Sequence, residues 1–300
     1  MRPTHLLTGN ATFTGYILPV LLLTKLPVIY RHGEEVAGHS LVHKALNLIL
    51  YRRVNQNIAN CSFLVNRLKK RFNRINIKVI YNLPPIAVGT KKSSISASSI
   101  KVEGKVILLY VGQITVQKGV PMLLEAFKEL LKRYHNLELH LIGDVPGIGN
   151  TKENATGILL SQYQAELPDQ LFYHGRQEET SAYYQFSDIH ICPSIYGEHS
   201  ANVIFEAKYH ALPSVIFAVG GLPELIDHQR DGYICHDITP SALADGIEYF
   251  LENTERRHQA GLTARSNLAE KYGVELFKQQ WVRILDAASE QHGSRQKDVT

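Results

Sequence analysis

The sequence predicts an α/β protein with two domains in which strands and helices alternate. Short apolar segments recur between segments of helical periodicity along most of the 300 residues, which is typical of parallel βα units. The segment 106–111 is apolar throughout, as a strand covered on both faces of a sheet requires. A stretch with neither pattern, residues 86–101, separates the two series. The chain is also long enough for two domains.

The first domain is expected in residues 1–85. Its predicted elements are an apolar helix at 14–25, a buried strand at 27–30, a helix at 40–54, a short strand at 57–62, a basic helix at 63–73 and a strand at 78–81. Leu83-Pro84-Pro85 ends the series, because proline lacks the N–H that a helix or a strand ladder needs. Residues 86–101, rich in serine and with few large apolar side chains, are predicted to be a linker.

The second domain is expected in residues 102–272, followed by a C-terminal helix and tail at 273–300. Its predicted strands lie at 106–111, 137–142, 171–174, 189–192, 215–219 and 233–235, and its predicted helices at 120–134, 180–186, 240–252 and 254–272. In the helix at 120–134 the apolar residues recur at intervals of three and four, the period of a helix with one buried face. A loop is predicted at 144–156. Such repeated units build an open, doubly wound sheet that binds ligands beyond the carboxyl ends of its strands.

The composition is that of an ordinary globular protein, with 44% apolar and 20% charged residues. Cys61, Cys192 and Cys235 share no close spacing, so neither a zinc site nor a disulfide framework is predicted. Reduced, buried thiols are typical of a cytoplasmic protein. The longest apolar run, 16–23, falls short of the roughly 20 residues of a membrane span and lacks the cleavage pattern of a signal peptide. We therefore expect a cytoplasmic protein.

Positive charge is concentrated in the first domain. Residues 1–85 contain twelve lysines and arginines against two acidic residues, Glu34 and Glu35. This excess predicts an anionic partner. Aromatic residues do not alternate with the basic ones, so nucleic acid is disfavoured. The run from Arg67 to Phe72 fits an amphipathic helix at the anionic inner face of a membrane, and the alternative is a solvated helix face.

Two glutamates, Glu198 and Glu206, frame the most informative segment. Small and polar residues follow the first and apolar residues precede the second, which predicts a loop and then a helix that begins near Ser200. A helix N-terminus has unsatisfied N–H groups and a partial positive charge, so it suits a phosphate. Gly220-Gly221 predicts a second helix start at the same cleft. Carboxylates beside a phosphate suit a sugar, whose hydroxyls donate to them.

Three further residues have both a functional and a structural interpretation. Lys118, in a strand–glycine–helix segment, would neutralise a diphosphate or belong to an ordinary loop. Arg176, just after a predicted strand, would stack on a nucleobase or lie on the surface. His32 would contact a sugar hydroxyl or fill a structural position, which is the commoner role of a lone histidine.

In this order the motifs resemble the retaining glycosyltransferases of family four, which have the GT-B fold of two Rossmann-like domains. The resemblance is strong over residues 106–272. The segments that carry it are Val111-Gly112, Lys118-Gly119, Phe172 to Gly175, Pro193-Ser194, Glu198, Glu206-Ala207, Pro213, Gly220 to Glu224 and Asp231-Gly232. Residues 4–85 resemble the second half of that family's N-terminal domain more loosely, through 27–33, 59–62 and 79–82.

The resemblance implies a nucleotide-sugar donor, a glycan or glycolipid acceptor of the lipopolysaccharide or exopolysaccharide type, and a reaction without metal or other cofactor. Its catalytic residues would be Lys118, which neutralises the leaving diphosphate, Glu198, which holds the donor sugar, and His32, which touches that sugar from the other domain. The donor-binding positions that it implies are Gly112, Gln113, Lys118, Arg176, Ser200, Ala201, Asn202, Val203 and, for the ribose hydroxyls, Glu206. Retention would need no protein nucleophile, since the leaving diphosphate would help deprotonate the acceptor.

Two departures from the family pattern leave other functions open. Gln113 stands where the family commonly has arginine, so one charged contact to the diphosphate is missing. The N-terminal domain starts late, so we expect an incomplete domain: a shortened product, one completed by another chain, or a reading frame begun at an internal methionine. One alternative is a catalytically impaired nucleotide-sugar-binding protein. The other is a sugar-nucleotide epimerase of the same fold, which the sequence context of Glu198 and Glu206 disfavours.

Overall fold

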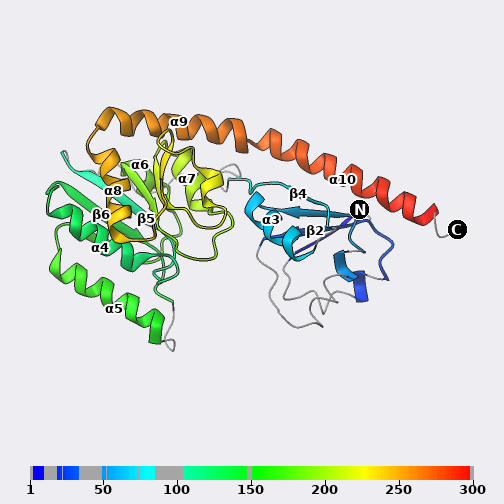
Figure 1. Cartoon of the computed structure of the whole chain (residues 1–300), viewed down its shortest axis with the longest axis horizontal. Coiled ribbons are helices and arrows are strands. Elements are labelled where there is room, and N and C mark those ends of the chain that lie inside the picture. Colours follow the sequence, from blue (N-terminus) through cyan, green and yellow to red (C-terminus); the bar gives the residue numbers. More distant parts are fainter. Residues whose placement is uncertain are drawn as a thin grey trace. The chain divides into compact units, whose positions relative to one another are not determined.

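The computed structural model describes residues 3–9, 19–21, 23–33, 49–51, 53–72, 75–84, 104–146 and 151–297. The chain forms two compact units, each with its own sheet (Figure 1). The first comprises Met1–Leu83 together with Tyr272–Thr300, and the second comprises Pro84–Lys271. Neighbouring strands are parallel in both sheets, which confirms the predicted α/β class. Among the helices of the described residues, none is both long and apolar enough to cross a membrane.

The second unit contains a six-stranded parallel sheet in the order β10-β9-β8-β5-β6-β7. Its strands are β5 (Val106–Val111), β6 (Leu137–Ile142), β7 (Leu171–Tyr173), β8 (Ile189–Cys192), β9 (Ser214–Phe217) and β10 (Gly232–Cys235). The chain proceeds outward from β5 to β7, returns to β8 on the other side of β5, and proceeds outward again. The carboxyl ends of β5 and β8 therefore flank the point where the strand order reverses, which is where doubly wound sheets bind ligands.

Helices cover both faces of this sheet. Successive side chains of a strand point to opposite faces, so one strand contributes to two cores. Leu108 and Tyr110 of β5 pack in a core with α4 and α8, and Ile107 and Leu109 pack in a separate core with α6. The helices of this part of the chain are α4 (Val120–Leu131), α5 (Thr151–Glu166), α6 (Ser181–Phe186), α7 (Asn202–Tyr209), α8 (Pro240–Leu251) and α9 (Thr254–Tyr272). Strand β5 is thus buried on both faces, which explains its continuous apolar sequence.

The first unit contains a four-stranded parallel sheet in the order β1-β2-β3-β4. Its strands are β1 (Leu6–Gly9), β2 (Val28–His32), β3 (Gln56–Ala59) and β4 (Ile77–Val79). Helix α3 (Ser62–Arg71) buries Leu64 and Leu68 in a core that includes Val28 and Tyr30 of β2. One face of this sheet is therefore covered by the predicted basic helix.

The C-terminal helix α10 (Val274–Lys297) belongs to the first unit. Its buried residues Ile284 and Ala288 pack on Ile29 and Ile58, which point away from the α3 side of the sheet. His5 Nε2 also lies 3.1 Å from the backbone oxygen of Leu285. The predicted C-terminal helix therefore supplies the second cover of the sheet at the start of the chain.

One strand was missed, and two expectations are corrected. The sequence did not indicate β1, because Leu6-Leu7-Thr8-Gly9 is too short to show a period. The predicted loop at 144–156 is wrong from Thr151, where α5 begins; nearby glycines obscure this helix start, and its apolar residues do not form one stripe, since Ile158 is exposed. After Gly220-Gly221 the chain forms a four-residue 3₁₀ turn, η4 (Leu222–Leu225), rather than a second helix start.

Boundaries elsewhere agree closely with the predictions. Strands β5, β6 and β8 and helix α9 have the predicted limits. The helix predicted at 120–134 ends at Leu131, and that predicted at 63–73 covers Ser62–Arg71. The predicted linker 86–101, and residues 14–18 and 40–48 of the predicted helices, lie outside the described residues.

Candidate functional site

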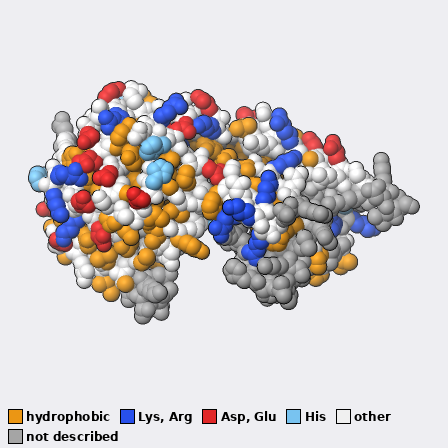
Figure 2. Space-filling model, viewed as in Figure 1, with side chains coloured by type: hydrophobic (Ala, Val, Ile, Leu, Met, Phe, Trp, Pro, Cys, Tyr) orange, Lys and Arg blue, Asp and Glu red, His pale blue; other side chains and the backbone are white. Residues whose placement is uncertain are grey.

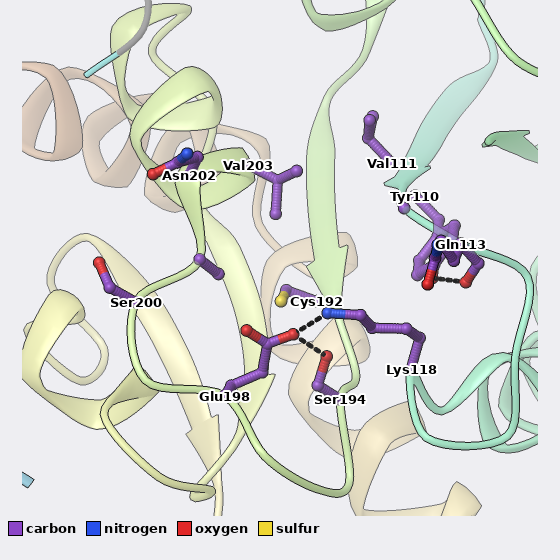
Figure 3. Close-up of a pocket in the computed structure, with 12 residues that line it drawn as sticks. Tyr110, Val111, Gln113, Lys118, Cys192, Ser194, Glu198, Ser200, Asn202 and Val203 are labelled. Carbon is purple, nitrogen blue, oxygen red and sulfur yellow. Dashed lines mark hydrogen bonds and ion pairs between the residues drawn. The ribbon is translucent and has the colours of Figure 1, made fainter. Parts of the chain in front are cut away.

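A pocket of about 330 Å³ lies in the second unit at the carboxyl ends of β5 and β8 (Figure 3). The loop after β5 forms one wall, and the start of α7 forms the opposite wall. The lining residues are Tyr110, Val111, Gly112, Gln113, Lys118, Cys192, Ser194, Glu198, Ser200, Ala201, Asn202 and Val203. The pocket therefore occupies the ligand-binding position of a doubly wound sheet.

The centre of the pocket is a hydrogen-bonded group of three side chains (Figure 3). Lys118 Nζ donates to Glu198 Oε1, and Ser194 Oγ donates to the same oxygen at 3.1 Å. The Glu198 side chain is 13% exposed and that of Lys118 is 37% exposed. Both donors use Oε1, and no described residue donates to Oε2 at hydrogen-bond distance. One oxygen of Glu198 thus remains for a hydroxyl of a ligand.

The backbone around this ion pair is fixed by two glycines. Gly119 has φ +72°, and a Cβ there would lie 1.8 Å from the backbone oxygen of Pro193. Gly220 has φ +60°, and a Cβ there would lie 1.8 Å from the backbone oxygen of Glu198. The amide of Gly221 donates to that same oxygen at 2.9 Å. Only glycine combines a left-handed backbone with so close an approach, so the loops that carry Lys118 and Glu198 are held against their neighbours.

The amino end of α7 forms the wall opposite Lys118. The helix begins at Asn202, and its first turn contains no acidic residue that would neutralise the helix dipole. Ser200 Oγ is buried and has no hydrogen-bond partner. An unsatisfied hydroxyl beside a helix N-terminus suits an anionic oxygen, such as that of a phosphate.

Two predicted donor-binding residues do not line this pocket. Glu206 lies farther along α7 and is partly buried; burial raises the pKa of its carboxyl, and a hydrogen bond with Tyr184 lowers it. Arg176 is exposed, and its Nη1 lies 3.4 Å from Asp144 Oδ2. The structure thus brings eight predicted residues together in one pocket, and Glu206 and Arg176 do not line it. The eight are Gly112, Gln113, Lys118, Glu198, Ser200, Ala201, Asn202 and Val203.

His32, predicted to touch the sugar, lies in the core of the first unit. Its side chain is 2% exposed, and its Nε2 lies 3.2 Å from Asn57 Oδ1. The ring packs against Tyr30 and Tyr51. Burial lowers the pKa of His32 to about 4, so the ring is neutral near pH 7. These contacts favour the structural interpretation of His32, and a role at the sugar stays a prediction.

Four lining residues were missing from the predicted site: Tyr110, Val111, Cys192 and Ser194. The Tyr110 hydroxyl donates to the backbone oxygen of Gln113 at 2.6 Å and so fixes the glycine loop. Cys192 ends β8, and burial raises the pKa of its thiol to about 12, which makes it a neutral group rather than a nucleophile. Ser194 holds Glu198. Val111 is the last residue of β5. All four residues lie at or near strand ends, and that position was the available signal.

The described residues contain no group of three or more histidine, cysteine, aspartate or glutamate side chains that could hold a metal ion. The polar groups of the pocket are instead one lysine, one carboxylate, two carboxamides, hydroxyls, a thiol and a helix N-terminus. Such a set can neutralise a bound phosphate and accept hydrogen bonds from a polyol.

Comparison with known proteins places this geometry in a family. Residues 91–267 match the family described as Glycosyl transferases group 1. Spore coat protein SA of Bacillus subtilis is 28% identical over 192 residues, which are 63% of this chain and 49% of that protein. An uncharacterized glycosyltransferase of Haemophilus influenzae is 28% identical over 186 residues, or 62% of this chain and 50% of that protein. The chain thus spans about half the length of the curated relatives that it matches.

Solved structures show the same fold. HepE of Anabaena, in complex with UDP, superposes with a TM-score of 0.78 at 17% identity, covering 94% of this chain and 79% of that chain. Sucrose-phosphate synthase of Thermosynechococcus elongatus gives a TM-score of 0.75 at 18% identity, covering 95% and 74%. These likenesses confirm the predicted GT-B fold class. The family match covers more than half of the residues of this chain, so the chain belongs to the glycosyl transferases group 1 family.

Proposed function

We propose that the protein transfers a sugar from a nucleotide-sugar donor to a glycan or glycolipid acceptor, with retention of configuration. The observation that carries the proposal is the Lys118–Glu198 ion pair, which faces the amino end of α7 across one pocket. A UDP complex of the structurally similar HepE supports a nucleotide as ligand. The acidic and basic partners give the pocket both functions that such a donor needs, a cation for the diphosphate and a carboxylate for the sugar.

Donor binding is expected to exchange partners within the ion pair. A diphosphate at the start of α7 carries more negative charge than one carboxylate, so it competes with Glu198 for Lys118. Lys118 then stabilises the charge that develops on the leaving diphosphate, which is where electrostatic catalysis is most effective. Glu198, still held by Ser194 at 3.1 Å, becomes free to accept from a donor-sugar hydroxyl.

Retention without a protein nucleophile fits the side chains of the pocket. Of the described residues that line it, Glu198 is the single carboxylate, and its proposed role is to accept a hydrogen bond from a donor-sugar hydroxyl. Cys192 is a buried, neutral thiol. The group that deprotonates the acceptor is therefore proposed to be the leaving diphosphate itself, on the face of the sugar from which it departs.

A second candidate is a nucleotide-sugar-binding protein without catalysis, and Gln113 is the observation that favours it. This exposed, neutral side chain lines the pocket where a second cation would help neutralise the diphosphate. One cation is enough for binding, while catalysis demands stabilisation of additional charge in the transition state. In this case Gln113→Arg should create turnover that the natural chain lacks.

The test is a panel of nucleotide sugars with a mixture of glycan and glycolipid acceptors. Binding is read from the rise in melting temperature, since a ligand that binds only the folded state stabilises it. Turnover is read from released nucleotide, and the anomeric configuration of the product is read by NMR. Transfer with an unchanged anomer supports the proposal, binding without turnover supports the second candidate, and an inverted product contradicts retention.

We further propose that the first unit docks on an anionic membrane surface through α3. Arg67, Lys69 and Lys70 are exposed on this helix, opposite the buried Leu64 and Leu68. Figure 2 shows blue side chains gathered in the region of α3. Clustered basic residues gain about 1 kcal/mol each near anionic lipid. Flotation with vesicles of anionic lipid at low salt should carry the protein upward, and a Lys69→Glu/Lys70→Glu variant should stay behind; equal flotation of both would contradict docking through α3.

A further inference from the structure

A second cavity, of about 450 Å³, lies in the first unit at the carboxyl ends of its strands. The lining residues are Leu7, Thr8, Gly9, Arg31, Gly33, Asn60 and Asn82. They come from β1, from the end of β2, and from the segments that follow β3 and β4. This is the edge at which doubly wound sheets bind ligands, and the volume is within the usual range for small-molecule sites.

Arg31 is the one cation among the described residues that line this cavity. Its Nη2 donates to Asn82 Oδ1 at 2.7 Å, while its Nε is buried and has no hydrogen-bond partner. No carboxylate of the described residues lies within ion-pair distance of it. A half-buried guanidinium with an unused donor is costly, because a charged group taken from water needs a partner.

Asn60 provides a second unsatisfied group among the residues that line the cavity. The residue is 7% exposed, and its Oδ1 is buried without a hydrogen-bond donor. Its Nδ2 is directed to the backbone oxygen of Gly33 at 3.5 Å. A donor group is therefore missing beside Oδ1, and an acceptor is missing beside Arg31 Nε. One ligand that carries both an anionic oxygen and a hydroxyl supplies both.

The backbone leaves room for such a ligand. Gly9 ends β1, and a Cβ there would lie 2.7 Å from the backbone oxygen of Arg31. The glycine thus lets the two strands stay close where the arginine side chain departs. Gly33 has no heavy atom within 4 Å of its Cβ position, so no described atom crowds the cavity beside it.

We propose that this cavity binds the anionic group of the acceptor, a phosphate or carboxylate on a hydroxylated molecule, with Arg31 as its charge partner and Asn60 as the acceptor of a neighbouring hydroxyl. The planar guanidinium matches either group through two parallel hydrogen bonds. That the bound molecule is the glycosyl acceptor follows from the proposed transfer reaction. That the cavity binds an anion is inferred from the cavity alone. Arg31 is then the residue that selects charged over neutral acceptors.

The test uses the full chain and three sugars that share the gluco configuration and differ only at C6: glucose, glucose 6-phosphate and glucuronate. Dissociation constants are measured by calorimetry for the wild type, Arg31→Met, Arg31→Lys, Asn60→Ala and the control Lys78→Met, which removes an exposed charge of the same unit. We expect at least one anionic sugar to bind about tenfold or more tightly than glucose, and Arg31→Met to abolish that preference. Arg31→Lys should lose part of it, since the charge remains but the planar fork does not.

The outcomes separate the sources of the anion and the two proposals. Preference for glucose 6-phosphate assigns a phosphate, and preference for glucuronate assigns a carboxylate. Equal binding of all three sugars, or a preference that survives Arg31→Met, overturns the anion site; if that variant does not fold, an undiminished preference in Arg31→Lys overturns it. The panel of nucleotide sugars is titrated in parallel: if the wild type binds none of them, the proposed donor function fails while the anion site stands or falls separately.

Discussion

Lys118 Nζ donates a hydrogen bond to Glu198 Oε1 and so joins the loop after β5 to the loop after β8 across the point where the strand order reverses. The two residues are 80 positions apart in the chain. A parallel sheet brings them together because the carboxyl ends of all its strands meet at one edge. The strand order of the sheet therefore brings the ion pair together. The position of Lys118 in this pair determines where the charge of a bound anion can be neutralised.

Gly119→Ala should disrupt this pair through the backbone. The new Cβ would lie 1.8 Å from the Pro193 oxygen, in a left-handed conformation that alanine disfavours. We expect the free energy of unfolding to fall by roughly 3 kcal/mol and binding of the proposed nucleotide-sugar donor to weaken, as measured by urea titration and calorimetry. The control is Gly293→Ala in α10, where no atom lies within 4 Å of the Cβ position; a gain of up to about 1 kcal/mol is expected there. Equal effects at both glycines would contradict the account.

Buried histidines should make the protein sensitive to acid. Burial lowers the pKa of His32 to about 4, below the value of about 6.5 for an unfolded chain. The unfolded state then binds more protons between these values, so the stabilisation is complete above pH 6.5 and is lost as the pH falls toward 4. His190 behaves alike, since burial lowers its pKa to about 3.

The variant His32→Gln isolates the contribution of this one ring. Between about pH 7 and about pH 5 the wild type should lose about 2 kcal/mol more unfolding free energy than the variant. The slope against pH is the readout, because Gln also changes the packing at every pH. His135→Gln, at an exposed position, is the matched control and should retain the wild-type slope. A wild-type slope in His32→Gln would show that the histidine is not responsible.

The C-terminal helix should stabilise the first unit. Ile284 is 2% exposed and packs on the sheet, while Val282, on the same helix, is 54% exposed. Ile284→Ala should lower the free energy of unfolding by about 2–4 kcal/mol and accelerate amide exchange in β2 and β3. Val282→Ala should change neither measurement by much. If exchange in these strands were the same in both variants, α10 would not be part of this core.

Much of the second unit could be predicted because its strands are covered on both faces. The continuous apolar run of β5 gave its limits directly, and the predicted limits of β6 and α9 also agree with the structure. β1 has only four residues, with Leu7 exposed, so no period distinguishes it. In α5 the apolar residues are not confined to one face, and the start lies among glycines.

In the candidate site, too, some residues could be predicted from the sequence and others could not. Lys118, Glu198 and the residues from Ser200 to Val203 stand in motifs whose chemistry is readable in the sequence. Tyr110 and Cys192 line the pocket because they stand at the ends of neighbouring strands, which requires knowledge of the strand order. The same holds for Arg31, Asn60 and Asn82, which meet only once β2, β3 and β4 are placed side by side.

The central claim is that Lys118 stabilises charge on the leaving diphosphate, and single-turnover transfer by Lys118→Met tests it most directly. Donor affinity and the rate constant of transfer are measured separately, with Lys132→Met, an exposed lysine at the end of α4, as control. We predict a loss of about 100-fold in the rate constant, a smaller loss in affinity, and no change in the control. An unchanged rate constant in Lys118→Met at saturating donor would contradict the account.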